Sequence, residues 1–294
     1  MAGAGPVPPW PGLGAIAPAL ARPGSQDGRP VPGLLDVTLP WITLAGLSAA
    51  PGLLGRIGPI TAAQARQLAR VAETDPAAQW RIVVTNDAGQ TIAVTRIRRR
   101  SRAGPGPPRE SPDTARDGPG AARVGPLGAG LVGRITLTVS QGTVGEQTVG
   151  GLGPATGPRP PIGTAAASLR AAATALDRAR DEAEADAVAG GCAHAGESSA
   201  YRPPPRLREF VIARDVTCRN PACRQPAWRA DLDHTLAYED HGRTCRCNLG
   251  GACRRDHQLK QHSRWKLEQT RPGEFTWTTP AGRTYTVSPD THPI

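Results

Sequence analysis

Five of the six cysteines fall between Cys218 and Cys253, and this crowding constrains the fold more than any other feature of the chain. So short a region has room for only a small apolar core, so cross-links or a bound metal must supply part of its stability. The stretch "MAGAGPVPPWPGLGAIAPAL" has no basic residue before its apolar part and is interrupted by Pro and Gly, which argues against a secretory signal. We therefore expect a cytoplasmic protein whose cysteines bind metal.

The first candidate metal site combines a turn and a helix. Cys218 and Cys223 lie in "CRNPAC", where a turn containing proline can bring two thiols together. Cys253 and Asp256 are three residues apart, so they share a face if they lie on a helix. These four residues predict a structural zinc site, and such sites contribute roughly 10 kcal/mol or more of folding free energy.

The fourth ligand of this site has alternatives. Cys245 and Cys247, in "TCRCN", are softer ligands than a carboxylate, so either one can take the place of Asp256. Free, buried cysteines are the interpretation without any metal.

A second candidate group contains no thiol. Asp233, His234, Asn248 and His257 offer oxygen and nitrogen donors, which suit a harder and more open divalent ion such as Mg or Mn. Adjacent residues on a helix point about 100° apart, so Asp256 and His257 must serve different sites. One short helix can therefore present a ligand to each of two metals.

This second group has the parts that phosphodiester hydrolysis needs. A metal ion stabilises charge on the phosphate, and an imidazole removes a proton from water. We expect Asp233 and His257 to hold the ion and His234 to be the general base. Asn248 either orients the loop that bears His234 or lends its amide oxygen to the metal.

The order of these residues resembles the HNH endonuclease motif, which has a ββα-metal fold. The match is made by the following residues: Asp233-His234, Asn248-Leu249, Cys253, His257 and Lys260, with the Cys218/Cys223 turn in front. The wider run from about Arg202 to Tyr285 is similar to the nuclease end of the bacterial 13E12-repeat family. The stretches "TLPWITLAGL", "GPITAAQARQLA" and "WRIVVTNDAG" resemble the last part of that family's preceding domain, most of which we expect to be missing.

The resemblance implies a role for each matching residue. His234 becomes the general base, Asp233 and His257 the catalytic-metal ligands, and Asn248 the supporting amide. It also implies a structural zinc bound by the four residues Cys218, Cys223, Cys253 and Asp256. Two positions depart from the family pattern: Asp256 stands where many relatives carry His, and His241-Gly242 replaces a Gly-Gly pair, where His241 becomes a further candidate ligand.

Composition indicates ordered segments joined by loose ones, because 35 Gly and 31 Pro occur among 294 residues and only 4% are aromatic. The expected fold class is α+β, with a small zinc-stabilised ββα-metal (HNH) nuclease domain after a partly disordered α+β and helical region. The expected segments are a disordered stretch (1–33), a remnant of the preceding domain (34–97), a disordered linker (98–124), a strand with a long Ala-rich helix (125–200) and the nuclease domain (201–290).

The charge of +10 favours a polyanionic partner, although a bias toward Arg codons explains part of it. We expect DNA, with RNA as an alternative, and no membrane span. The predicted phosphate contacts cluster on or just after the helix of His257: Arg254, Arg255, Lys260 and Arg264. A non-catalytic zinc-containing nucleic-acid-binding module and an inactive nuclease fragment are the competing interpretations. The sequence predicts neither base preference nor oligomeric state.

Overall fold

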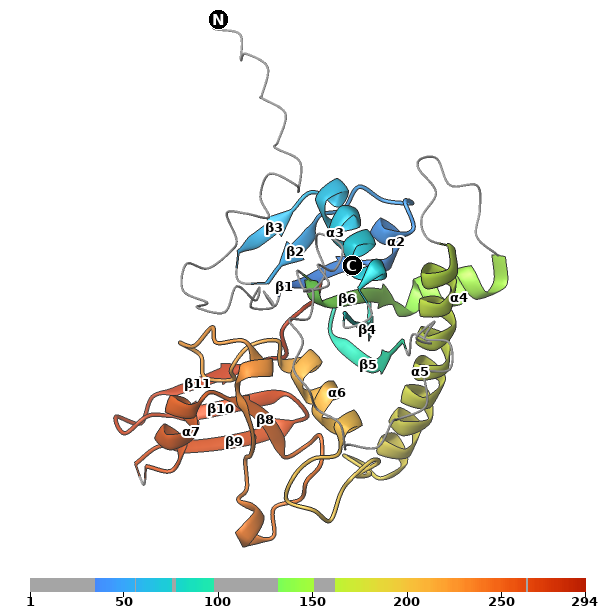
Figure 1. Cartoon of the computed structure of the whole chain (residues 1–294). Helices are drawn as coiled ribbons and strands as arrows, with labels where there is room; N and C mark the ends of the chain where they lie inside the picture. The colour runs from blue at the N-terminus through green and yellow to red at the C-terminus, as the bar shows by residue number, and fades with distance from the viewer. Residues whose placement is uncertain (1–34, 56, 76–77, 98–131, 151–161, 263) are drawn as a thin grey trace, which may run out of the picture.

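The computed structural model describes residues 35–294 except 56, 76–77, 98–131, 151–161 and 263 (Figure 1). The segments predicted to be disordered, 1–33 and 98–124, lie outside the described residues. The described part is a mixture of helices and strands, as the α+β prediction states. No helix within it is long and apolar enough to cross a membrane.

A six-stranded sheet dominates the first half of the described chain. Its elements, in chain order, are β1 (Leu35–Pro40), α2 (Trp41–Leu44), β2 (Gly52–Leu54), β3 (Gly58–Ile60), α3 (Ala62–Thr74), β4 (Gln79–Thr85), β5 (Thr91–Arg96), β6 (Val132–Ser140), α4 (Gln141–Gly150) and α5 (Ile162–Val188). The strand order is β3-β2-β1-β6-β4-β5. Strand β6 pairs in parallel with β1 and β4, and the other pairs are antiparallel.

This topology corrects the division between 34–97 and 125–200. The two ranges form one sheet, because β6 lies between β1 and β4. Parallel neighbours are joined by long crossovers, and pairing across so long a segment leaves no local signal in the sequence. The described strands of 34–97 and 125–200 therefore belong to one sheet.

Short-range features of the sequence explain where several elements of this half begin and end. Thr61 is the N-cap of α3, where its hydroxyl accepts from the backbone N–H of Gln64 and the Gln64 side chain accepts from the Thr61 N–H. Strands β4 and β5 form an antiparallel β-hairpin, with Gly89 at a φ of +77° in its turn. Helix α5 is the predicted Ala-rich helix, and Gly190 follows its end with a φ of +66°.

The sheet and its helices share one apolar core. Helix α3 packs on β1 and β6, whereas α5 packs on β4 and β5. The Trp41 indole donates to the Ala165 carbonyl across 3.0 Å, which joins α2 to α5. The largest side chains with at most 2% exposure in this core are Leu39, Trp41, Leu44, Trp80, Ile82, Ile135 and Leu137.

The C-terminal half has smaller sheets. Its elements are α6 (Pro205–Asp215), a 3-10 turn at Ala227–Arg229, β7 (Asp231–His234), a 3-10 turn at Tyr238–Asp240, β8 (Leu249–Ala252), α7 (Arg254–Lys260), β9 (Lys266–Arg271), β10 (Glu274–Thr278) and β11 (Thr284–Val287). Strands β7 and β8 form an antiparallel pair, and α7 follows at once and contacts both. Strands β9, β10 and β11 form a separate antiparallel sheet. Residues 231–260 thus run strand, strand, helix.

Helix α6 joins the two halves, because it packs against both β5 and β8 (Figure 1). Its last two residues are a buried ion pair, in which Arg214 Nε donates to Asp215 Oδ1 across 2.7 Å. Arg214 also donates to the carbonyls of Arg246 and Leu249, both at 2.7 Å. Asp215 accepts from the backbone N–H of Gly251 at 2.8 Å. The pair therefore fixes β8 against α6.

We expect Arg214→Met to lower the free energy of unfolding by about 3–5 kcal/mol, because the change leaves the Asp215 carboxylate buried without a partner. Urea unfolding followed by circular dichroism measures this loss. Arg243→Met is the matched control, since the Arg243 side chain is 55% exposed and pairs with Glu197; it should cost under about 1 kcal/mol. Equal losses in the two variants would contradict the anchoring role of Arg214.

A short tail after β11 returns to the first sheet. The His292 N–H donates to the Gly89 carbonyl at 2.8 Å, and Thr291 forms a β-bridge with Gln90. The His292 imidazole donates from Nε2 to the Ala213 carbonyl at 2.8 Å. Burial lowers the pKa of His292 from its usual 6.5 to about 4, so the folded protein keeps this ring neutral.

Lowering the pH from 7 to 5 should therefore destabilise the fold through His292 by about 1–2 kcal/mol. Below pH 6.5 the unfolded chain takes up a proton at this residue, while the folded chain resists it until about pH 4. Thermal unfolding of the wild type and of His292→Gln, which keeps a donor for the Ala213 carbonyl, isolates the effect. The wild type should lose more stability than the variant over this interval, and identical pH dependence would refute the assignment.

Candidate metal clusters and histidine site

The four predicted zinc ligands are brought together. Cys218 and Cys223 lie on the loop after α6, Cys253 is the N-cap of α7, and Asp256 lies in its first turn. Their ligand atoms all lie within 4.8 Å of one another, so this group could hold a metal ion. We call it the first cluster.

Contacts inside the first cluster are those of a site for a cation. The thiols of Cys218 and Cys253 donate to Asp256 Oδ2 across 3.3 and 3.1 Å. The Cys218 sulfur also accepts from the Cys253 backbone N–H at 3.2 Å, and Cys223 Sγ lies 3.9 Å from Cys253 Sγ. Amide groups that point at sulfur stabilise a thiolate.

Electrostatics distinguish the carboxylate from the thiols. Burial acts to raise the pKa of Asp256, but hydrogen bonds from Arg255 and from the cysteine thiols outweigh it and lower that pKa below its usual value. Burial raises the pKa of Cys218 and Cys253. A bound cation reverses this for the thiols, because coordination favours the thiolate.

A second cluster was not predicted from the sequence. Cys245 and Cys247 meet Cys192 and His194, and the four ligand atoms again lie within 4.8 Å of one another. Cys192 Sγ is 3.6 Å from Cys245 Sγ, and Cys247 Sγ is 3.5 Å from His194 Nδ1. Cys245 and Cys247 thus lie in a group of their own, which removes the reason to place either of them in the first cluster.

The second cluster could also hold a metal ion. A hydrogen bond from the Cys247 thiol lowers the pKa of Cys245 to about 5 although Cys245 is fully buried. The same bond raises the pKa of Cys247, and burial adds to that rise. The spacing Cys-x-His at 192–194 and Cys-x-Cys at 245–247 is the sequence signal that could have predicted this cluster.

Asp233 and His257, the predicted ligands of a catalytic ion, lie next to each other. His257 Nε2 is 3.3 Å from Asp233 Oδ1 and joins α7 to β7. His257 Nδ1 is 3.3 Å from Asp231 Oδ2. The Lys260 ammonium lies 2.8 Å from Asp233 Oδ2 and also donates to the His234 carbonyl.

The imidazole of His234 is 3% exposed and makes different contacts. Its Nε2 lies 2.8 Å from the Thr244 hydroxyl, and its ring stacks on Tyr201 with a centroid distance of 5.4 Å. Tyr238 lies 5.7 Å away at a tilt of 57°. Burial lowers the pKa of His234, Asp233 acts to raise it, and Lys260 acts to lower it. Thr244 and Tyr201 are contacts of this site that the sequence analysis did not identify.

Asn248 uses its amide to hold the loop between β7 and β8. Its Oδ1 accepts from the Leu236 N–H at 2.8 Å, and its Nδ2 donates to the carbonyls of Leu236 and Arg243, both at 3.0 Å. The prediction was that Asn248 orients the loop that bears His234; here His234 ends strand β7, and the loop that Asn248 contacts follows it. His241 is exposed at a φ of +64° and belongs to neither of the two clusters found among the described residues.

The predicted phosphate contacts differ in how far their side chains are exposed to solvent. The side chains of Arg254 and Arg255 are 79% and 72% exposed, and Arg264 is also exposed. Lys260 differs, because its side chain is 14% exposed and its ammonium is engaged by Asp233. Lys260 therefore contacts the carboxylate of the site, and its role as a phosphate contact stays a prediction.

Comparisons with known proteins add sequence relatives only. The uncharacterized protein Rv3776 of Mycobacterium tuberculosis H37Rv is 44% identical over 91 residues, which are 31% of this chain and 17% of that protein. The uncharacterized protein Rv2100 of the same strain is 41% identical over 100 residues, 33% of this chain and 18% of that protein. The chain thus spans less than a fifth of the length of these relatives. No family model and no solved structure matches it.

Proposed function

We propose that this chain is a metal-dependent endonuclease that hydrolyses phosphodiester bonds in DNA, in the manner of HNH nucleases. In this proposal His234 is the general base, Asp233 and His257 hold a divalent ion such as Mg or Mn, and the first cluster holds a structural zinc. Thiolates with one carboxylate suit zinc, whereas a carboxylate with an imidazole suits the harder ion.

One observation carries the proposal: the α7 helix divides its donors between two sites. Asp256 faces the thiols of the first cluster, with Oδ2 3.1 Å from Cys253 Sγ. The next residue, His257, faces Asp233 on β7 at 3.3 Å. A strand pair followed by a helix that separates a thiol group from a carboxylate–imidazole pair is what the nuclease interpretation requires.

The pair of Asp233 and His257 fits a divalent ion. It offers one oxygen and one nitrogen donor on two adjacent elements and leaves further positions for water and phosphate oxygens. Such an ion supplies charge stabilisation at the scissile phosphate. Lys260 neutralises Asp233 while no cation is bound, and we expect its ammonium to move toward the phosphate when the carboxylate binds metal.

His234 is suited to remove a proton. Its lowered pKa keeps the imidazole unprotonated near neutral pH, which a general base requires. The Thr244 hydroxyl fixes the ring orientation through its contact with Nε2. Tyr201 covers the ring and is 58% exposed, so a substrate reaches the imidazole by displacing an exposed side chain.

We expect the full chain to nick supercoiled plasmid in the presence of Mg, Mn or Ni ions. His234→Ala should reduce the nicking rate by about 10²–10⁴-fold, because a positioned base contributes that much. Agarose electrophoresis over time measures the rate. His262→Ala is the matched control, since His262 is an exposed histidine just after α7 and should leave the rate unchanged.

Three outcomes have defined meanings for a zinc-loaded, folded preparation. Cleavage that persists in His234→Ala removes this residue as the base. No cleavage with any of the three ions overturns the endonuclease proposal. Salt-sensitive DNA binding without cleavage would favour the non-catalytic binding module instead.

Arg254, Arg255 and Arg264 are exposed residues that we expect to contact phosphate. Arg255 also donates to Asp256 of the first cluster, so the test uses the other two. Replacing both by Ala should lower the slope of log affinity against log salt by about 2, because each phosphate contact releases about one counterion. Fluorescence anisotropy with a labelled duplex at several salt concentrations measures the slope. Arg283→Ala, exposed in the turn before β11, is the control, and an unchanged slope in the Arg254/Arg264 variant would contradict the assignment.

A further inference from the structure

We propose that Cys192, His194, Cys245 and Cys247 form a second zinc site, separate from the first cluster, and that its ion holds the segment 243–248 in place behind His234. This inference concerns metal binding and does not depend on nuclease activity. It assigns a function to residues that the endonuclease interpretation leaves unused.

The donor set selects zinc. Three sulfurs and one imidazole nitrogen contain no oxygen donor, so the group does not suit Mg or Ca. Four protein donors with no open position are typical of structural rather than catalytic zinc. Cys245 is fully buried and the other three are partly buried, so bulk water has little access to the centre of the group.

The distances agree with a tetrahedral ion. Zn–S bonds of about 2.3 Å and a Zn–N bond of about 2.0 Å give S–S edges of about 3.8 Å and S–N edges of about 3.5 Å. The separation between Cys192 Sγ and Cys245 Sγ is 3.6 Å, and that between Cys247 Sγ and His194 Nδ1 is 3.5 Å. A disulfide needs sulfurs about 2.05 Å apart, and Cys192, Cys245 and Cys247 are free thiols.

The backbone after α5 orients two of the four ligands, Cys192 and His194. The chain leaves α5 through a glycine turn, in which the Gly191 N–H donates to the Asp186 carbonyl at 3.0 Å. The Ala193 N–H, between the two ligands, donates to Asp186 Oδ1 at 2.8 Å. His194 has a φ of +56°, a conformation that few non-glycine residues adopt. This local structure turns Cys192 and His194 toward the loop before β8.

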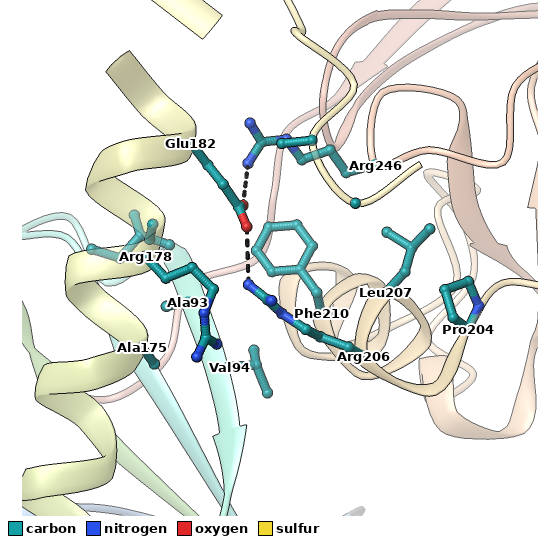
Figure 2. Close-up of a pocket in the computed structure, with 14 residues that line it drawn as sticks. Ala93, Val94, Ala175, Arg178, Glu182, Pro204, Arg206, Leu207, Phe210 and Arg246 are labelled. Carbon is teal, nitrogen blue, oxygen red and sulfur yellow. Dashed lines mark hydrogen bonds and ion pairs between the residues drawn. The ribbon is translucent and has the colours of Figure 1, made fainter. Parts of the chain in front are cut away.

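Ion pairs to α5 position the segment that carries the other two ligands, Cys245 and Cys247. Arg246, between Cys245 and Cys247, lies 3.3 Å from Glu182 of α5 and also pairs with Asp186. Figure 2 shows Glu182 between Arg246 and Arg206 of α6, at the edge of a pocket of about 190 Å³. Three thiolates around one zinc leave a net charge of about −1, and the nearby Arg246 guanidinium offsets it.

The cluster connects directly to the residues around His234. Thr244, whose hydroxyl contacts His234 Nε2, immediately precedes Cys245. The Cys245 carbonyl accepts from the Asn248 N–H at 3.0 Å, and Asn248 holds the loop after His234. The Ser198 N–H donates to the Thr244 carbonyl at 3.0 Å. These two residues form a single β-bridge between the segment after α5 and the loop before β8. Arg214 donates to the Arg246 carbonyl of this loop. A zinc ion bound by Cys245 and Cys247 would tie the same loop to the segment that carries Cys192 and His194.

The test counts zinc in the purified full chain by native mass spectrometry. We expect two zinc ions per chain, one after Cys192→Ser with Cys247→Ser, and one after Cys223→Ser with Cys253→Ser. Hydrogen exchange of a peptide covering 243–248 should accelerate on the order of tenfold in the first double variant only. Neither readout uses nucleic acid, so failure of the endonuclease proposal leaves this result intact and the reverse also holds.

His194→Cys separates metal binding from simple packing. A four-cysteine set still binds zinc, so this variant should keep two ions, whereas His194→Ala should bind the second ion at least about tenfold more weakly. A wild type that contains fewer than two zinc ions overturns the inference. So does a disulfide between Cys192 and Cys245 in freshly purified protein, detected by thiol counting under denaturing conditions. Both measurements on the wild type remain decisive if a variant does not fold.

Discussion

The buried pair of Arg214 and Asp215 is the interaction on which the C-terminal half depends. It satisfies the carbonyls of Arg246 and Leu249 and the N–H of Gly251 at the end of one helix. These groups belong to β8 and to the loop before it. Asn248 immediately precedes β8 and Cys253 immediately follows it. The Arg214–Asp215 pair therefore sets the position both of the loop that contacts His234 and of the first cluster.

The surrounding apolar core is too small to do this alone. The apolar cluster around α6 and β8 contains Leu207, Val211 and Leu249 as its buried members, whereas the six-stranded sheet has a much larger buried set. Strand β8 contributes glycines where neighbours approach closely: a Cβ on Gly250 would lie 2.4 Å from the Phe275 ring. With little side-chain volume available, charged pairs and clusters of metal ligands carry more of the structural role.

The sequence predicted those features that depend on neighbouring residues. The first cluster was predicted from the spacing and residue types of its four members, and the long helix α5 from its Ala-rich sequence. The position of β6 was not, because its partners β1 and β4 lie on the far side of residues 98–131.

The second cluster was missed for a similar reason. Cys192 and His194 follow a helix that the sequence assigns to a different segment, so nothing local links them to Cys245 and Cys247. The contact between Lys260 and Asp233 also joins two elements, α7 and β7. The sequence around Lys260 resembles that of an exposed basic helix and does not indicate this contact. Pairs of ligands separated by about fifty residues become visible only when the chain is folded.

We propose that each of the two clusters binds a zinc ion. A crystal of the full chain, with anomalous diffraction measured on both sides of the zinc absorption edge, locates zinc without reference to activity. We expect two zinc peaks, one among Cys218, Cys223, Cys253 and Asp256 and one among Cys192, His194, Cys245 and Cys247. A map that lacks the zinc peak at one or both clusters, or that has one peak bound by cysteines from both clusters, would contradict this proposal.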